Sequence, residues 1–293
     1  MTVGVTADRL DPSRIASPAI GAPPPDRTIA RIVSTSPSIT EMLFALGLGD
    51  RVVGVSRFCR VPDQVRALPK IGTFLRPDAE LIARLRPTLV VLHKSQGGIE
   101  QRLSSLKLPF ITVERGSLAS VYSTARAIGA AAGVPERAAA WTADLDARLD
   151  AIRRAVAGRP PRRVLIVVGR RTGMLSDLVA VGHDSYLSDV IAIAGGINVL
   201  QDQTLPAYPR ISMETVIRLD PDVIVDAADM GESIEERRQR QRQTEAMWQR
   251  QPLIASSGAR VHGAMTDAFV VPGPRVVDAA RLLASWLHGV EIR

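Results

Sequence analysis

Short apolar runs alternate with amphipathic segments along most of the chain, and this alternation predicts its secondary structure. Buried strands are predicted for the runs RIVS, RVVGVS, FITV and RVLIVV. Between the strands, apolar residues recur at helical spacing, as in residues 40–46, which end at Gly47. Strands that alternate with helices are typical of a parallel sheet with helices on both faces. The pattern therefore predicts an α/β fold.

One predicted helix is much longer than the others. Residues 136–157 are rich in Ala, Leu, Arg and Asp, contain no Gly or Pro, and are followed by Gly-Arg-Pro-Pro. Apolar residues at helical spacing in this segment predict about six helical turns. After it, the strand–helix order of the first half begins again. We therefore expect an N-terminal lobe (30–135), a linking helix (136–158) and a C-terminal lobe (159–293).

A segment of the first lobe recurs in the second lobe. Residues 80–91 read ELIARLRPTLVV, and residues 214–225 read ETVIRLDPDVIV. The glutamate, arginine, leucine, proline and final valine coincide in the two segments. A repeat at this separation is too long for a solenoid, whose period is a few tens of residues. It indicates two related lobes on one chain.

The repeat places one glutamate near each predicted helix start. Asp78 and Ser212 are N-capping residue types, which makes Glu80 and Glu214 the second helical residue, where the helix dipole favours a carboxylate. A well-formed helix start explains either glutamate alone. Helix starts, however, lie at the carboxyl edge of a parallel sheet, where such sheets bind ligands. On opposite lobes, the two carboxylates fit a two-point docking surface better than a catalytic pair.

Aromatic residues make up only 4% of the chain, so those in loops stand out. Phe74 and Tyr208 each lie six residues before a repeat glutamate. Aromatic side chains on facing loops would hold a flat, partly apolar ligand, although ordinary packing explains any one of them alone. The remaining predicted ligand contacts follow strands or precede helices, and they are Pro37, Ser38, Phe58, Arg210 and Phe269.

Charge and reactive side chains narrow the function classes. The net charge of +7 would suit an anionic ligand, but no basic block is interleaved with aromatics, so we expect no nucleic-acid partner. We expect Cys59, the single cysteine, to be a small buried residue rather than a nucleophile. His183 is a candidate contact to a metal centre, although a loop histidine is more often simply exposed. The sequence has no nucleophile-elbow, P-loop or dinucleotide-binding motif, so we expect no enzyme.

The N-terminal segment carries no recognisable targeting signal. Residues 1–29 contain Pro-Pro-Pro and scattered charges and lack the apolar core of a secretory signal, so we predict a disordered leader. No apolar run approaches the 18 or so residues of a membrane span. The sequence therefore leaves a cytoplasmic location open.

Four segments stand out when taken together: RIVSTSPSITEMLFALGLGDRVVGVS, KIGTFLRPDAELIARLRPTLVV, AGGINVL and YPRISMETVIRLDPDVIV. With these segments the chain resembles the periplasmic substrate-binding proteins of ABC importers for cobalamin, haem and iron–siderophores, and most nearly the cobalamin-binding branch. The resemblance covers about residues 30–289. It implies two Rossmann-like lobes with parallel central sheets, joined by one long rigid helix. It also implies a ligand cleft between the lobes and small lobe motions.

The resemblance also implies roles for the residues already singled out. Glu80 and Glu214 would pair with arginines of the permease. Phe74 and Tyr208 stand where the cobalamin branch has a tryptophan on each lobe, and Phe58 where that branch has a tyrosine. The implied function is to capture a corrinoid or similar metal chelate and to deliver it to the permease, as a periplasmic or cell-envelope monomer without a cofactor of its own.

Other functions stay open beside this one. A ferric siderophore or haem is the alternative ligand, because arginines near the predicted cleft would suit an anion. These arginines are Arg57, Arg60, Arg76 and Arg210. A cytosolic sensor or a metallocofactor enzyme on the same two-lobed fold is the alternative of another class. For an enzyme, Cys59 with His183 is the sole candidate pair.

Overall fold

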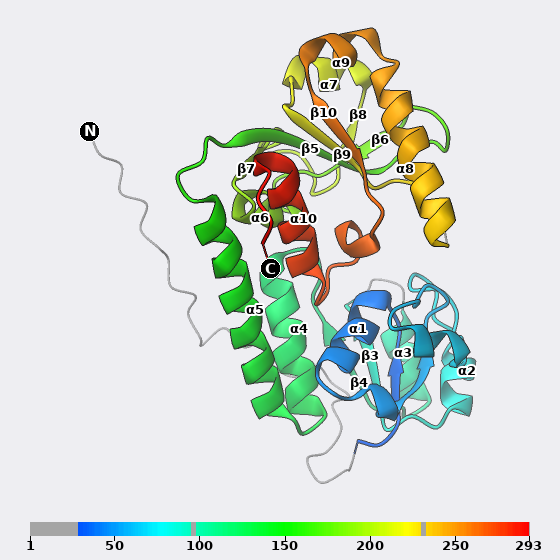
Figure 1. Cartoon of the computed structure of the whole chain (residues 1–293). Coiled ribbons are helices and arrows are strands. Elements are labelled where there is room, and N and C mark those ends of the chain that lie inside the picture. The colour runs from blue at the N-terminus through cyan, green and yellow to red at the C-terminus, as the bar shows by residue number, and fades with distance from the viewer. Residues whose placement is uncertain (1–28, 95–97, 230–232, 293) are drawn as a thin grey trace.

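The computed structural model describes residues 29–94, 98–229 and 233–292. Two lobes, each built around its own sheet, lie one above the other (Figure 1). The predicted leader lies outside the described residues except for Ile29, which is buried in the first lobe. Ile29, which the sequence placed in the leader, is therefore part of the core of the first lobe.

The first lobe contains a parallel sheet in the order β2-β1-β3-β4. Its strands are β1 (Ile32–Ser34), β2 (Val52–Val55), β3 (Leu89–His93) and β4 (Phe110–Val113). Its helices are α1 (Pro37–Ala45), α2 (Ala79–Arg84), α3 (Ile99–Ser105) and two short 3-10 helices, Gly49–Arg51 and Asp63–Ala67. Most strand residues are buried, as expected for a parallel sheet covered on both faces. The predicted strands are confirmed.

Helix α1 begins earlier than its hydrophobic pattern predicted. The Ser36 hydroxyl accepts a hydrogen bond from the backbone N–H of Ile39, and Pro37 occupies the first helical position. A proline there is favourable because its missing N–H would be unpaired anyway. The start of α1 is therefore set by a cap and a proline in a segment whose apolar periodicity had not yet begun.

The second lobe contains a six-stranded sheet in the order β10-β9-β5-β6-β8, with β7 also paired to β5. Its strands are β5 (Arg162–Gly169), β6 (Leu178–Ala180), β7 (Gly196–Asn198), β8 (Arg210–Ile211), β9 (Val223–Asp226) and β10 (Arg260–Gly263). The centre of the sheet is parallel as predicted, because β5 pairs in parallel with β7 and β9, and β9 with β10. The sheet as a whole is mixed, because β6 runs antiparallel to β5 and β8. The strands β6 and β8 are too short to show a periodic pattern in the sequence.

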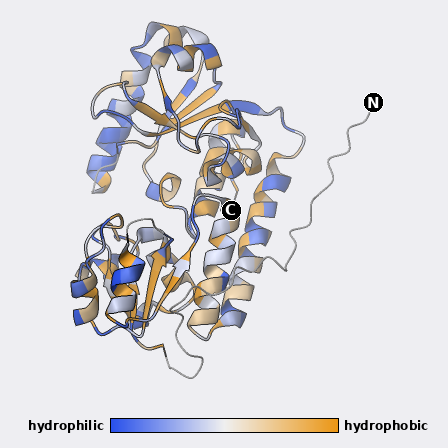
Figure 2. Ribbon diagram, turned by 180° about the vertical axis from the view of Figure 1, so that it is seen from behind, coloured by the Kyte–Doolittle hydropathy of each residue, from blue (hydrophilic) through white to orange (hydrophobic). Residues whose placement is uncertain are grey.

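The helices of the second lobe surround this sheet. They are α6 (Tyr186–Ile193), α7 (Met213–Leu219), α8 (Ile234–Gln249), α9 (Pro252–Ser257), α10 (Val276–His288) and the 3-10 helix Asp267–Phe269. Helix α8 is mainly hydrophilic, whereas apolar residues concentrate in the strands (Figure 2). The charge run of α8 is largely exposed, as a solvated face would be. Within the described residues, no helix is both long enough and apolar enough to cross a bilayer.

A buried ionic network fastens α8 to the second sheet. The Arg170 Nε and the Trp248 indole N–H both donate to one Asp226 carboxylate oxygen, each at 2.8 Å. Arg170 also donates to the Thr244 hydroxyl at 3.0 Å. The Arg170 and Asp226 side chains are 1% and 0% exposed. Buried charges of this kind require partners, and here α8 supplies them through Trp248 and Thr244.

Two antiparallel helices, α4 (Leu118–Ala131) and α5 (Pro135–Val156), run along one side of both lobes (Figure 1). Helix α5 corresponds to the predicted linking helix. Its buried face contacts α4, and it also contacts α6 and α10 of the second lobe. A helix that packs on both lobes along its length holds them in a fixed relation.

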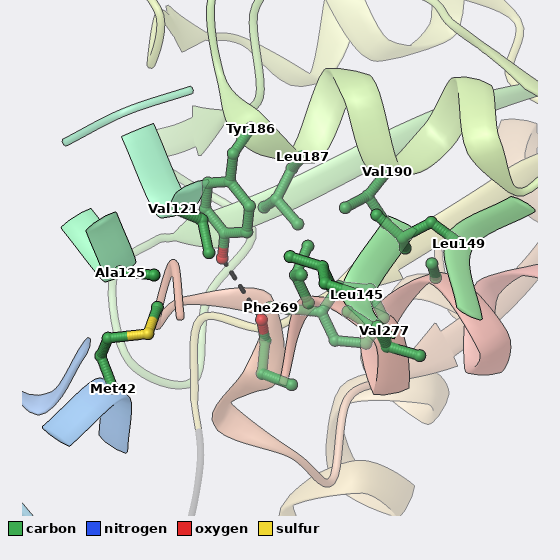
Figure 3. Close-up of a cluster of buried hydrophobic side chains, with 14 of the residues drawn as sticks. Met42, Val121, Ala125, Leu145, Leu149, Tyr186, Leu187, Val190, Phe269 and Val277 are labelled. Atoms are coloured by element: carbon green, nitrogen blue, oxygen red, sulfur yellow. Dashed lines mark hydrogen bonds between the residues drawn. The ribbon is translucent and has the colours of Figure 1, made fainter. Parts of the chain in front are cut away.

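The two lobes share one hydrophobic core at this joint (Figure 3). Met42 of α1 lies there with side chains from α4, α5, α6 and α10, and the Tyr186 hydroxyl donates to the Ala268 carbonyl. Opening the joint would expose this apolar surface to water at a cost of about 25 cal/mol per Å². The shared core therefore favours small lobe motions over a wide hinge.

Candidate functional site

Both repeated helix starts have the predicted caps. The Asp78 carboxylate accepts from the backbone N–H groups of Glu80 and Leu81, at 2.9 and 3.1 Å. The Ser212 hydroxyl accepts from the backbone N–H of Thr215 at 3.2 Å. Glu80 and Glu214 are therefore second helical residues, and both are exposed. Their helix-start positions are confirmed, and their carboxylates are accessible to a partner.

The surroundings of Glu80 leave it accessible. Its carboxylate lies 3.5 Å from the guanidinium of Arg102 on α3, and both side chains are more than half exposed. Exposed ion pairs contribute about 0–1 kcal/mol, so a partner's cation can replace Arg102 at little cost. Beside the Glu214 helix, a surface hollow is lined by Leu175, Ser176, Asp177, Arg210, Ile211, Ser212 and Met213. Arg210, a predicted ligand contact, thus lines a hollow at the start of the helix that carries Glu214.

At the carboxyl edge of the first sheet, two serines at the start of α1 contact a histidine at the end of β3. The His93 Nε2 atom lies 3.0 Å from the Ser36 hydroxyl and 3.1 Å from the Ser38 hydroxyl. Burial and the nearby charge of Arg115 lower the pKa of His93 to about 4. His93 is therefore neutral at physiological pH.

Sequence reasoning missed His93, although its position directly after a predicted strand was a usable signal. Ser38, a predicted ligand contact, is itself only 7% exposed, and Pro37 beside it is partly exposed. The Ser–His contacts order this edge of the sheet. They also leave little of Ser38 for a ligand to touch.

Three predicted aromatic contacts are accessible to a ligand. Phe58, after β2, is 50% exposed. Phe74 is partly exposed, and the Arg115 guanidinium lies over its ring, with 5.4 Å between the guanidinium carbon and the ring centroid. On the second lobe, Tyr208 is 40% exposed and its hydroxyl accepts from the Ser185 hydroxyl at 3.0 Å. Each lobe therefore carries an aromatic side chain available for stacking.

Phe269 requires a correction. Its side chain is 0% exposed and stacks on Trp286, with ring centroids 5.7 Å apart. A side chain without accessible surface cannot line a ligand site in this conformation. The loop position of Phe269 suggested exposure, but the chain turns it inward through the 3-10 helix Asp267–Phe269.

Cys59 and His183, the candidate pair for an enzyme, differ in their exposure to solvent. Cys59 is 2% exposed and its sulfur accepts from the Thr40 hydroxyl at 3.1 Å, while burial raises its pKa. This fits the predicted small buried residue. His183 is exposed and its Nδ1 lies 2.8 Å from Asp184. In the described ranges, no three His, Cys, Asp or Glu side chains gather as a metal site would require.

An ionic triad joins the lobes where the loop before α10 meets α1. The Arg275 guanidinium donates to both Glu41 carboxylate oxygens, at 2.6 and 2.8 Å, and to Asp267 at 2.5 Å. Gly273 packs against the Ser38 backbone at the same junction. These contacts bring the start of α1 against the second lobe, which fixes how the two carboxyl edges face each other.

The chain is similar to known binding proteins over most of its length. The family model described as periplasmic binding protein matches residues 32–256. An uncharacterised ABC transporter substrate-binding lipoprotein of Bacillus subtilis (strain 168) is 27% identical over 266 residues, covering 88% of this chain and 80% of the relative. A vitamin B12-binding protein of Pectobacterium atrosepticum is 25% identical over 273 residues, covering 89% of this chain and 90% of the relative.

Solved structures share the two-lobed fold. A periplasmic haem-binding protein of Roseiflexus sp. RS-1 has a TM-score of 0.72 and 29% identity, covering 87% of this chain and 96% of that one. The vitamin B12-binding protein of Vibrio cholerae has a TM-score of 0.71 and 23% identity, covering 88% of this chain and 96% of that one. At this identity the similarity shows only that the two proteins share a fold. With a family match over well over half of its length, the chain belongs to the periplasmic binding protein family, whose members bind solutes and are not enzymes.

Proposed function

We propose that this protein is the substrate-binding component of an ABC importer and captures a corrinoid or a similar metal chelate between its lobes. One observation carries the proposal: each lobe presents an exposed glutamate at a capped helix start and an exposed or partly exposed aromatic six residues before it. Relatives named as vitamin B12-binding and haem-binding proteins support the ligand class. The protein acts as a monomer in the periplasm or at the cell envelope and delivers its ligand to a permease.

Ligand binding is tested by titrating the purified chain with cyanocobalamin, a ferric hydroxamate and haemin and following ligand absorbance. We expect one of them to bind with a Kd of about 1 μM or tighter. Phe74→Ala and Tyr208→Ala should each weaken that ligand by about tenfold, because a lost aromatic contact costs on the order of 1 kcal/mol beyond its buried area.

Leu253→Ala serves as the control, because Leu253 is 56% exposed on α9, outside the predicted ligand contacts. It should leave the affinity unchanged. If none of the three chelates binds at micromolar concentration, the proposed ligand class is wrong. If both aromatic variants bind as tightly as the wild type, the ligand does not lie between Phe74 and Tyr208.

A haem or ferric siderophore is the second candidate ligand, and a specific observation favours it. Arg57, Arg76 and Arg115 are all exposed on the first lobe, around Phe58 and Phe74. Guanidinium groups bind carboxylate oxygens strongly and often in pairs of hydrogen bonds. The titration separates this candidate from the corrinoid, because each chelate is offered alone.

Permease docking is tested with the double variant Glu80→Ala/Glu214→Ala. We expect its ligand affinity to stay within about twofold of wild type, and its affinity for the cognate permease complex in nanodiscs to fall by about tenfold or more. The physical reason is that the interface with the permease loses two charge-assisted contacts, and each such contact contributes up to about 3 kcal/mol. Docking is measured by surface-bound nanodiscs titrated with the binding protein.

Glu136→Ala is a matched control for this docking prediction. Glu136 is also the second residue of a helix and is also exposed, but it lies at the start of α5. It should leave docking unchanged. A loss of ligand affinity in the double variant, with docking of the ligand-free protein intact, would contradict the docking role of the two glutamates.

A further inference from the structure

Arg115 is an exposed cation at the ligand edge of the first lobe. It follows the carboxyl end of β4 by two residues, on the same sheet edge as Phe58, Phe74 and His93. Among the ion pairs formed within the described ranges, none includes Arg115. The adjacent carboxylate, Glu114, instead lies 3.6 Å from the ammonium group of Lys94. The guanidinium thus keeps its donors for another anion.

The position of Arg115 is held from two sides. Its guanidinium lies over the Phe74 ring at 5.4 Å from the centroid, where the ring quadrupole attracts a cation. The next residue, Gly116, has a φ angle of +110°, which favours glycine. The Gly116 carbonyl accepts a hydrogen bond of 2.6 Å from the backbone N–H of Tyr186 in the second lobe. A stacked guanidinium on an anchored segment loses little freedom when it binds an anion.

The side chains around Arg115 do not neutralise it. His93 is near enough for the Arg115 charge to help lower its pKa to about 4, so the imidazole adds no charge at physiological pH. Lys94 and Glu114 are opposite charges that pair with each other. The wall that carries Phe74 therefore presents an aromatic ring with a guanidinium stacked over one of its faces.

We propose that Arg115 is a specificity-determining residue that selects chelates carrying an anionic substituent, such as a carboxylate, at the rim of the ring system that stacks on Phe74. The planar guanidinium would donate paired hydrogen bonds to the anion while Phe74 contacts the apolar part of the same ligand. This inference rests on the proposed chelate-binding function and narrows its ligand class.

The test uses pairs of ligands that share a ring system and differ in whether their substituents carry carboxylates or neutral esters and amides. Haemin and haemin dimethyl ester form one pair, and dicyanocobyrinic acid and dicyanocobinamide form a corrin pair. Each is titrated into the full chain and into Arg115→Gln at several salt concentrations. We expect Arg115→Gln to weaken the carboxylate-bearing member of the bound pair by about tenfold or more and to change its neutral counterpart by less than about twofold. Added salt should weaken the carboxylate ligand for wild type more than for the variant.

Arg126→Gln is the matched control, because Arg126 is an exposed arginine on the outer face of α4 and its loss changes the net charge equally. It should discriminate between the ligands as the wild type does. An equal effect of Arg115→Gln on both members of a pair, or no effect on either, would overturn the inference while leaving chelate binding intact. If the wild type binds no member of either pair, the inference fails. If it also binds neither cyanocobalamin nor the ferric hydroxamate, the proposed function fails as well.

Discussion

Asp226→Ala should lower the free energy of unfolding by about 3–5 kcal/mol, the largest effect we expect from a single substitution in this chain. The change leaves the Arg170 guanidinium buried without its carboxylate and removes the acceptor of the Trp248 indole N–H. A domain has about 5–15 kcal/mol of stability in all, so much of it would be lost. Urea denaturation followed by circular dichroism measures the change.

The exposed pair Asp150–Arg153 on α5 provides the control, since both side chains are about half exposed. Asp150→Ala should change stability by less than about 0.5 kcal/mol. Asp226→Asn keeps hydrogen-bonding atoms at the site and should cost less than Asp226→Ala, which provides a measurable variant if the alanine form does not fold. A cost below about 1 kcal/mol for Asp226→Ala would show that the network contributes little to stability.

Arg275→Ala should destabilise the protein by about 3 kcal/mol near neutral pH, because it leaves the buried Glu41 carboxylate and Asp267 without their shared cation. Glu41→Ala should cost less, about 1–2 kcal/mol, since Arg275 would keep Asp267 as a partner. The same denaturation experiment measures both. Equal costs for the two variants would mean that Asp267 does not compensate for the loss of Glu41.

The loss in Arg275→Ala should also depend on pH with a defined sign. Burial raises the pKa of Glu41 above the ordinary value of 4.5, and Arg275 is the main group that lowers it. Without Arg275, folded Glu41 binds a proton more readily than it does in the unfolded chain, so stability falls as pH rises through the window above 4.5. The stability lost in Arg275→Ala relative to wild type should therefore be large near neutral pH and shrink as the pH falls toward 4.5. A deficit independent of pH would contradict this.

Local hydrogen bonds explain why the sequence predicted the repeated helix starts well. Asp78 and Ser212 cap by bonding to N–H groups two or three residues ahead, so the signal and the structure lie in the same short segment. The long helix α5 was equally visible, because its buried face repeats at helical spacing over 22 residues. Both features depend on neighbours in sequence.

Phe269 and His93 show where that reasoning fails. Nothing next to Phe269 in sequence indicates that Trp286 will cover its ring, and nothing next to His93 indicates that two serines from the start of α1 will bond to it. The strands β6 and β8, of three and two residues, likewise become visible only when β6 pairs with β5 and β8 pairs with β6. Burial and pairing of this kind are properties of distant segments.

The sequence by itself determined the alternating strands and helices, the duplicated helix starts with their carboxylates, and the long helix between the halves. Each of these follows from periodicity and capping within about 20 residues. Only the tertiary structure decided how the lobes face each other, because Glu41 and Arg275 are 234 residues apart and meet solely through the packing of α1, α5 and α10. It also placed Arg115 on Phe74, since a cation–π contact depends on where two loops come together in space.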